Sequence, residues 1–66
     1  MRLIITRHAR DQMIERGIDE EQIKIAILRG AKIVQTDGCA AQYTYIRVAY
    51  RIIEEDTYKI KSVMVE

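Results

Sequence analysis

Tyrosine and arginine side chains alternate with mainly apolar ones along residues 43–53 of this chain. If the segment is a β-strand, its successive side chains point to opposite faces of a sheet. Cations on one sheet face neutralise phosphates, and tyrosine rings stack on bases. This pattern predicts a surface for single-stranded RNA, to which two lysines of the next segment would add charge. Its residues are Tyr43, Tyr45, Arg47 and Arg51, with Lys59 and Lys61 if the register places them there.

The overall charge gives this prediction little support. The 66 residues include 11 Lys and Arg against 10 Asp and Glu, so the formal net charge is +1. Domains that bind nucleic acids usually have a strongly basic balance, so an anion site here must come from local arrangement. An ordinary solvated sheet face, on which the stems of Tyr, Arg and Lys cover the backbone, is the alternative interpretation.

His8 is the only histidine of the chain. Histidine is the side chain that most readily moves protons near neutral pH, so His8 is the default general acid or base if the protein is an enzyme. A lone surface histidine more often has no such role. One histidine among scattered carboxylates offers no spacing for a metal, and Cys39, the only cysteine, excludes an internal disulfide. We therefore expect no metal and no cofactor.

Most enzyme classes find no support in the sequence. It contains no glycine-rich phosphate loop, no nucleophile elbow and no paired carboxylates apart from the acidic turn at residues 54–56. RNA cleavage is compatible with so small a chain, because RNA supplies its own nucleophile, the 2′-hydroxyl. The protein need only position the RNA, move protons and stabilise charge at the phosphorus.

The elements that must position these residues follow from cap and turn signals. Thr6 and Gly17 delimit one predicted helix, and Asp19 and Gly30 delimit a second. After Gly30 the apolar period changes from about 3.6 to about 2, which indicates strands. The predicted fold is a single α+β domain over residues 1–66, with two N-terminal helices packed on a three- to four-stranded antiparallel sheet. Its expected strands are Ala31–Thr36, Tyr43–Ile53 and Thr57–Val65, with a short extra strand at Leu3–Ile5.

The second predicted helix has two apolar sides. Ile23, Ala26 and Ile27 form one stripe, while Ile25 and Leu28 fall on the other side of the wheel. One side of a helix suffices to cover a sheet. We therefore expect Ile25 and Leu28 to form a protein interface, either in a homodimer or with a partner protein, and packing against the first helix is the alternative.

Several short motifs resemble one family across nearly the whole chain. They are Ile5-Thr6-Arg7-His8-Ala9-Arg10 followed by Met13, then Arg16-Gly17-Ile18, the acidic helix start that leads to Gly30, and Ala49-Tyr50-Arg51. Together they resemble DUF4258, a family of small uncharacterised proteins. That family is similar to RelE-like toxins of toxin-antitoxin pairs, which are metal-independent RNA-cleaving domains with two helices against an antiparallel sheet.

The resemblance implies an endoribonuclease of the mRNA interferase type with an antitoxin as protein partner. His8, Arg16 and Arg51 are the matching positions and would be catalytic. His8 and Arg51 can meet only if the start of the first helix lies over a sheet edge, because the face with Arg51 is expected to point away from the helices. A non-catalytic module that binds another protein is the alternative function.

The N-terminal apolar run is short. It consists of Leu3, Ile4 and Ile5 and ends at Thr6 and Arg7. A signal peptide or a membrane anchor needs a longer apolar stretch. We therefore expect a small cytoplasmic domain that does not enter a membrane.

Overall fold

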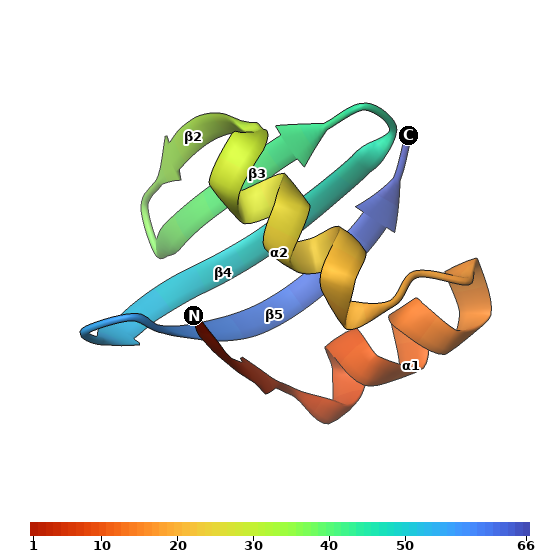
Figure 1. Cartoon of the computed structure of the whole chain (residues 1–66), viewed down its shortest axis with the longest axis horizontal. Coiled ribbons are helices and arrows are strands. Elements are labelled where there is room, and N and C mark those ends of the chain that lie inside the picture. The colour runs from red at the N-terminus through yellow and green to blue at the C-terminus, as the bar shows by residue number, and fades with distance from the viewer.

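The computed structural model describes the whole chain and contains two helices and five strands (Figure 1). The strands form one sheet in the order β1-β5-β4-β3-β2, in which β1 runs parallel to β5 and all other neighbours are antiparallel. The α+β class with two N-terminal helices is confirmed, and the sheet has five strands rather than three or four. The elements are β1 (Arg2–Ile5), α1 (Arg7–Arg16), α2 (Glu20–Arg29), β2 (Ala31–Gln35), β3 (Gly38–Tyr43), β4 (Ile46–Glu54) and β5 (Thr57–Val65).

Both helices begin and end where the cap signals predict. The Thr6 hydroxyl accepts a hydrogen bond from the Ala9 N–H at 3.1 Å, and Gly17 ends α1 in the left-handed conformation with φ of 68°. Asp19 and Gln22 form a reciprocal capping box at the start of α2, with bonds of 2.9 and 3.0 Å. The cap residues thus account for the sharp corner between the helices.

The fifth strand comes from a turn that the sequence pattern hides. The strand predicted over Tyr43–Ile53 is wrong at its start, because a two-residue turn at Thr44 and Tyr45 separates β3 from β4. Thr44 has φ of 54°, which is unusual for a β-branched residue. Neither turn residue is one that tight turns favour, and the small residues after Gly38 have low strand propensity, so the hairpin gave no clear signal.

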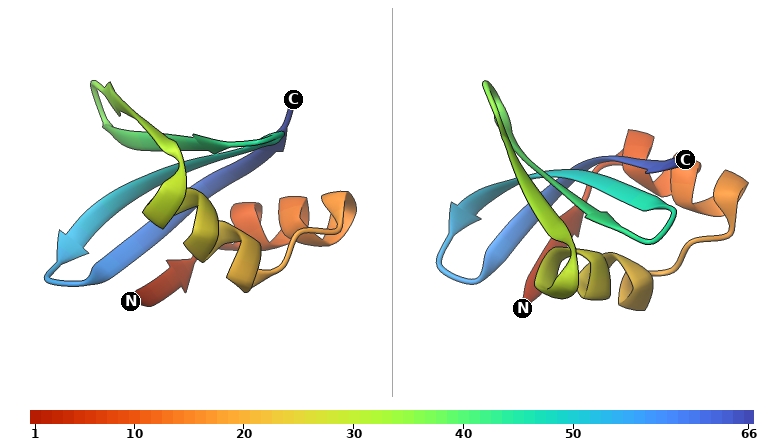
Figure 2. Two further views of the ribbon diagram at one scale, coloured as in Figure 1. Left: turned by 45° about the horizontal axis from the view of Figure 1, so that its top comes forward. Right: turned by 90° about the horizontal axis from the view of Figure 1, so that it is seen from above.

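The hydrophobic core lies between the helices and one face of the sheet. Ile46, Val48 and Tyr50, which alternate with the arginines along β4, are buried, and α2 packs over β3 and β4 (Figures 1 and 2). From α2 the buried residues are Ile23, Ala26 and Ile27, as predicted. The rest of the core cluster is Ala9, Met13, Ile18, Ala41, Ile60 and Val63.

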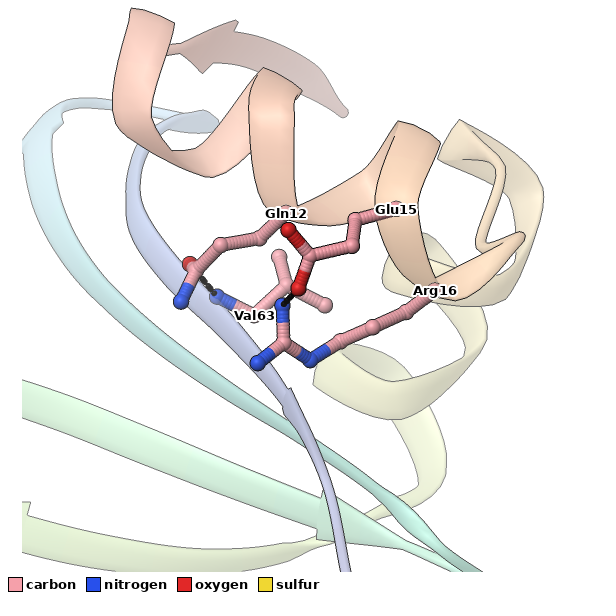
Figure 3. A network of polar contacts seen from close by, with 4 residues as sticks. All are labelled: Gln12, Glu15, Arg16 and Val63. Atoms are coloured by element: carbon pink, nitrogen blue, oxygen red, sulfur yellow. Dashed lines mark hydrogen bonds and ion pairs between the residues drawn. The ribbon is translucent and has the colours of Figure 1, made fainter.

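Helix α1 lies at an edge of the sheet. β1 pairs with only the first half of β5, and the chain then turns at Thr6, whose hydroxyl donates to the Ile60 carbonyl at 3.0 Å. Along the second half of β5, the Val63 N–H donates to Oε1 of Gln12 in α1 at 2.7 Å (Figure 3). α1 therefore replaces β1 as the neighbour of β5. Neither helix is long and apolar enough to cross a membrane.

Candidate nucleic-acid interface

The sheet face opposite α2 carries most of the predicted RNA-binding cations. On β4, Arg47 and Arg51 point away from the buried residues, as the alternation predicts. Lys59 of β5 is the register partner of Arg51, so these two cations are neighbours on the same face. We call this surface, with Arg47, Arg51, Lys59 and Lys61, the cationic face.

Lys61 joins the cationic face through a β-bulge. Ile60 pairs with Tyr50 and Ser62 pairs with Ala49, so Lys61 is the extra residue and has no partner on β4. Its ammonium group lies 3.5 Å from the carboxylate of Asp37 and also donates to the backbone carbonyl of Asp37. The Lys61 side chain therefore crosses from β5 to the turn between β2 and β3.

Two acidic residues that the sequence analysis did not single out neutralise part of this face. Asp37 is 3.5 Å from Arg51 as well as from Lys61, and Glu66 is 3.1 Å from Arg47. Lys59 makes no ion pair. Because the acidic partners Glu66 and Asp37 are 49% and 79% exposed, each pair contributes at most about 1 kcal/mol to stability. The cations are thus held in place without being locked away from a ligand.

Tyr43 and Tyr45 do not share the cationic face, so the predicted placement of both is wrong. The two-residue turn reverses the alternation: Tyr43 pairs with the buried Ile46, and Tyr45 lies in the turn itself with 51% of its surface exposed. Both tyrosines instead line a cavity of about 100 Å³ between α2 and the β3–β4 turn, together with Ile25. Neither tyrosine is therefore available to stack on a base beside Arg47 and Arg51.

His8 and Arg16 stand at opposite ends of α1. His8 is exposed two residues after Thr6, which bonds to the Ile60 and Lys61 carbonyls, so the helix does start at the sheet edge. Arg16 lies eight residues further on, about 12 Å along a helix that rises 1.5 Å per residue. Its guanidinium is 3.3 Å from Glu15 (Figure 3). No hydrogen bond or ion pair joins His8, Arg16 and Arg51, and the structure does not gather them into one cluster.

The two predicted interface residues differ in exposure. Leu28 is 68% exposed, whereas Ile25 is half-buried against the cavity with the tyrosines. The sequence analysis missed a second, larger groove of about 480 Å³ between the helices. Its apolar floor includes Ile14, which is 74% exposed, and Arg10 pairs with Glu20 across it at 3.5 Å.

Titratable groups show one clear perturbation, and it lies in the core. Burial raises the pKa of the Tyr50 phenol, and the nearby Cys39 and Tyr58 raise it further. The Tyr50 and Tyr58 rings lie 5.8 Å apart. Cys39 is a half-buried free thiol. The structure contains no group of three or more His, Cys, Asp or Glu side chains that could hold a metal ion.

The protein is a small α+β domain. Its two helices pack against one face of a mostly antiparallel sheet, and the opposite face is cationic. The family model of DUF4258, a domain of unknown function, matches residues 5–65. The chain therefore belongs to this family, as its motifs predict.

One solved structure shares the fold over almost its whole length. A chain in the crystal structure of the toxin-antitoxin complex RelBE2 from Mycobacterium tuberculosis matches with a TM-score of 0.64. The match covers 98% of this chain and 96% of that chain at 18% sequence identity. At this identity the likeness shows a common fold. No curated protein matches the sequence.

Proposed function

We propose that this protein is a toxin-like RNA-binding protein, a metal-independent endoribonuclease of the mRNA interferase type that works in the cytoplasm and pairs with an antitoxin. The observation that supports RNA binding best is the cationic face, where four cations from two neighbouring strands share one side of the sheet. Cations at this density provide phosphate contacts without any base-specific requirement. The fold shared with a chain of a toxin-antitoxin complex supports the antitoxin partner.

The cleavage step needs only groups that this chain supplies. A base takes the proton of the RNA 2′-hydroxyl, and the hydroxyl oxygen attacks the adjacent phosphorus as the bond from phosphorus to the 5′-oxygen breaks. The leaving 5′-oxygen takes up a proton, so the products are a 2′,3′-cyclic phosphate and a free 5′-hydroxyl. For this step the bound RNA must bring one phosphorus within reach of groups that do not touch one another in the free protein. These are Arg51 with its neighbour Lys59, which would stabilise the negative charge on the phosphorane, and His8, which would transfer a proton.

The position of His8 limits how RNA can lie. His8 follows the turn at Thr6 beside β5, so an RNA strand that crosses β4 and β5 would reach it at the sheet edge. Arg16 is about 12 Å further along the helix axis and would contact a different phosphate of the same strand. In this proposal the two residues act on neighbouring nucleotides.

Cleavage of a labelled single-stranded RNA in the presence of a chelator tests the proposal. Wild-type protein should cleave, and His8→Ala should lower the rate by about 10²- to 10⁴-fold if His8 is an acid or base. Arg7→Ala, an exposed change at the neighbouring helix position, is the matched control and should retain the rate. Equal rates for His8→Ala and wild type would show that His8 takes no part in cleavage. If no preparation cleaves RNA, the proposed ribonuclease activity is wrong.

A non-catalytic protein-binding module is the second candidate function. The exposed Leu28 beside the half-buried Ile25 supports it, because neither residue belongs to the buried core cluster. Such a surface fits a homodimer or a docked antitoxin. Light scattering at micromolar concentration should then report twice the chain mass, and Leu28→Glu should give a folded monomer.

A matched variant separates association from folding in that experiment. Ile14→Glu places the same charge on an equally exposed isoleucine of α1 and should leave the mass unchanged. A wild-type monomer would contradict the homodimer. A Leu28→Glu protein that unfolds would show that this side chain belongs to the core.

A further inference from the structure

Asp37 lies between two cations of the cationic face. Its Oδ1 lies 3.5 Å from Nη2 of Arg51, and its Oδ2 lies 3.5 Å from Nζ of Lys61. The two carboxylate oxygens are thus divided between two cations of neighbouring strands. A phosphodiester also presents two anionic oxygens, so the same pair of cations suits it.

The backbone is built to bring Lys61 to this position. The β-bulge frees Lys61 from pairing with β4, and the small residues Ala49 and Ser62 stand beside it in the register. At the other end, a Cβ added to Gly38 would lie 3.3 Å from Nζ of Lys61 and 2.8 Å from the Tyr50 carbonyl oxygen. Gly38 also has φ of 131°, which other residues rarely adopt. Glycine at this turn therefore avoids a clash with the Tyr50 carbonyl, beside which the end of the Lys61 side chain lies.

The contact is placed so that a ligand can replace it. The side chains of Asp37, Arg51 and Lys61 are 79%, 59% and 32% exposed, and ion pairs to so solvated a carboxylate are weak. The bond from Lys61 to the Asp37 backbone carbonyl does not involve that carboxylate. The hairpin of β2 and β3 that carries Asp37 projects from the body of the molecule (Figure 2). Asp37 can therefore leave the two cations without any change in the core.

We propose that Arg51 and Lys61 form a site for one phosphodiester of single-stranded RNA and that Asp37 is its built-in competitor. In the free protein the carboxylate occupies the site, and bound RNA displaces it. The inference rests on the proposed RNA binding and adds a regulatory element to it. Asp37 lowers the affinity for RNA. It also makes the slope of log K against log salt shallower by the value of one phosphate contact.

Fluorescence anisotropy with a labelled oligouridine over a range of salt concentrations tests the site. Asp37→Asn keeps the size of the side chain and removes its charge. It should tighten binding about 3- to 10-fold at low salt, and the slope of log K against log salt should steepen by about 0.7, the value for one phosphate of a single strand. Glu21→Gln is the matched control, because it changes the net charge equally on α2 and makes no ion pair.

The double variant locates the effect. In an Arg51→Ala and Lys61→Ala background, Asp37→Asn should give no further gain, since its two partners are gone. If wild type binds RNA but Asp37→Asn behaves like Glu21→Gln, the competitor role is overturned while RNA binding stands. If neither wild type nor Asp37→Asn binds, the proposed function fails first.

A measurement on the wild-type protein covers the case in which a variant does not fold. During titration with the same oligouridine, the backbone amide of Gly38 and the side-chain methylene signals of Lys61 should shift together in NMR spectra. Such a shift reports release of Asp37 from Lys61. Signals that stay fixed while RNA binds would contradict the displacement.

Discussion

Alternate residues of β4 face two different environments. On the side of α2, Ile46, Val48 and Tyr50 are 4%, 0% and 2% exposed. On the other side, Arg47 and Arg51 reach only exposed acids and solvent. We call the side with Ile46, Val48 and Tyr50 the covered face. It stabilises the fold through burial of apolar surface, whereas the ion pairs of the cationic face contribute little to stability.

The end of β4 shows that coverage, rather than strand alternation alone, makes the difference. Ile52 points to the same side as Tyr50, yet it is 56% exposed because it lies beyond the part of the strand that the helices cover. Its partner Tyr58 is half-buried. The two faces therefore differ in burial only where the helices lie over the sheet.

The largest expected effect comes from a cavity in the covered face. Ile60 is fully buried in β5, and Ile60→Ala should lower the free energy of unfolding by about 2–5 kcal/mol. The total for a domain of this size is about 3–10 kcal/mol, so the milder Ile60→Val, at about 0.5–1.5 kcal/mol, keeps the loss measurable by urea denaturation. Met64→Ala on the cationic face is the control and should cost less than about 1 kcal/mol. Equal losses at both positions would contradict the division into two faces.

A smaller effect is expected where α1 closes the edge between the two faces. Gln12→Ala leaves the Val63 N–H without its partner, which should cost about 1–3 kcal/mol. Thermal unfolding measures the loss, and hydrogen exchange at the Val63 amide should accelerate. Glu15→Gln on the exposed side of the same helix is the control. An unchanged exchange rate in Gln12→Ala would show that α1 does not protect this edge.

The helices and the covered face were predictable because their signals are local. Thr6, Gly17 and Asp19 each occupy a cap position with a residue that caps favour, and α2 shows its buried stripe at helical spacing. Alternation within β4 likewise places Arg47 and Arg51 correctly. Short-range patterns of this kind depend on one element at a time.

The rest of the candidate site depends on pairing between elements, which the sequence does not display. The turn at Thr44 lacks the usual turn residues. For this reason the prediction continued the strand through it and assigned Tyr43 to the wrong face of the sheet. The bulge that frees Lys61 depends on the register between β4 and β5. The Asp-Gly sequence at residues 37–38 is typical of a turn. The contact of Asp37 with Lys61, however, joins residues 24 positions apart and follows only from the sheet order.

Removal of charge from the cationic face should change binding and leave stability alone. Arg47→Ala with Arg51→Ala should weaken binding of single-stranded RNA by about 10-fold and make the salt slope shallower by about 1.4, which corresponds to two phosphates. The free energy of unfolding should change by no more than about 0.5 kcal/mol per site.

The control for that pair removes the same charge from the other side of the sheet. Lys24→Ala with Arg29→Ala changes two cations of α2 and should leave the salt slope as in wild type. If both pairs reduce binding equally, RNA responds to net charge, and the cationic face is not a defined site.

The smallest effect concerns the phenol that the covered face encloses. Because burial raises the pKa of Tyr50, the folded protein holds this proton more tightly than the unfolded chain, whose phenol has the ordinary pKa of 10.0. The contribution to stability is complete below pH 10 and is lost as the pH rises through the folded pKa. Its slope is at most about 1.4 kcal/mol per pH unit, and Tyr50→Phe should remove it while it changes stability at neutral pH by less than about 1 kcal/mol.

Urea denaturation of wild type and Tyr50→Phe at several pH values from 8 to 11.5 measures this contribution, because groups that both proteins share cancel in the difference between them. The difference in unfolding free energy between wild type and Tyr50→Phe should be constant below about pH 10 and then move in favour of Phe. Tyr45→Phe, which makes the same substitution at an exposed ring in the β3–β4 turn, is the variant for comparison. A constant difference for Tyr50→Phe would mean that water reaches its hydroxyl and that the covered face is less closed than its burial indicates.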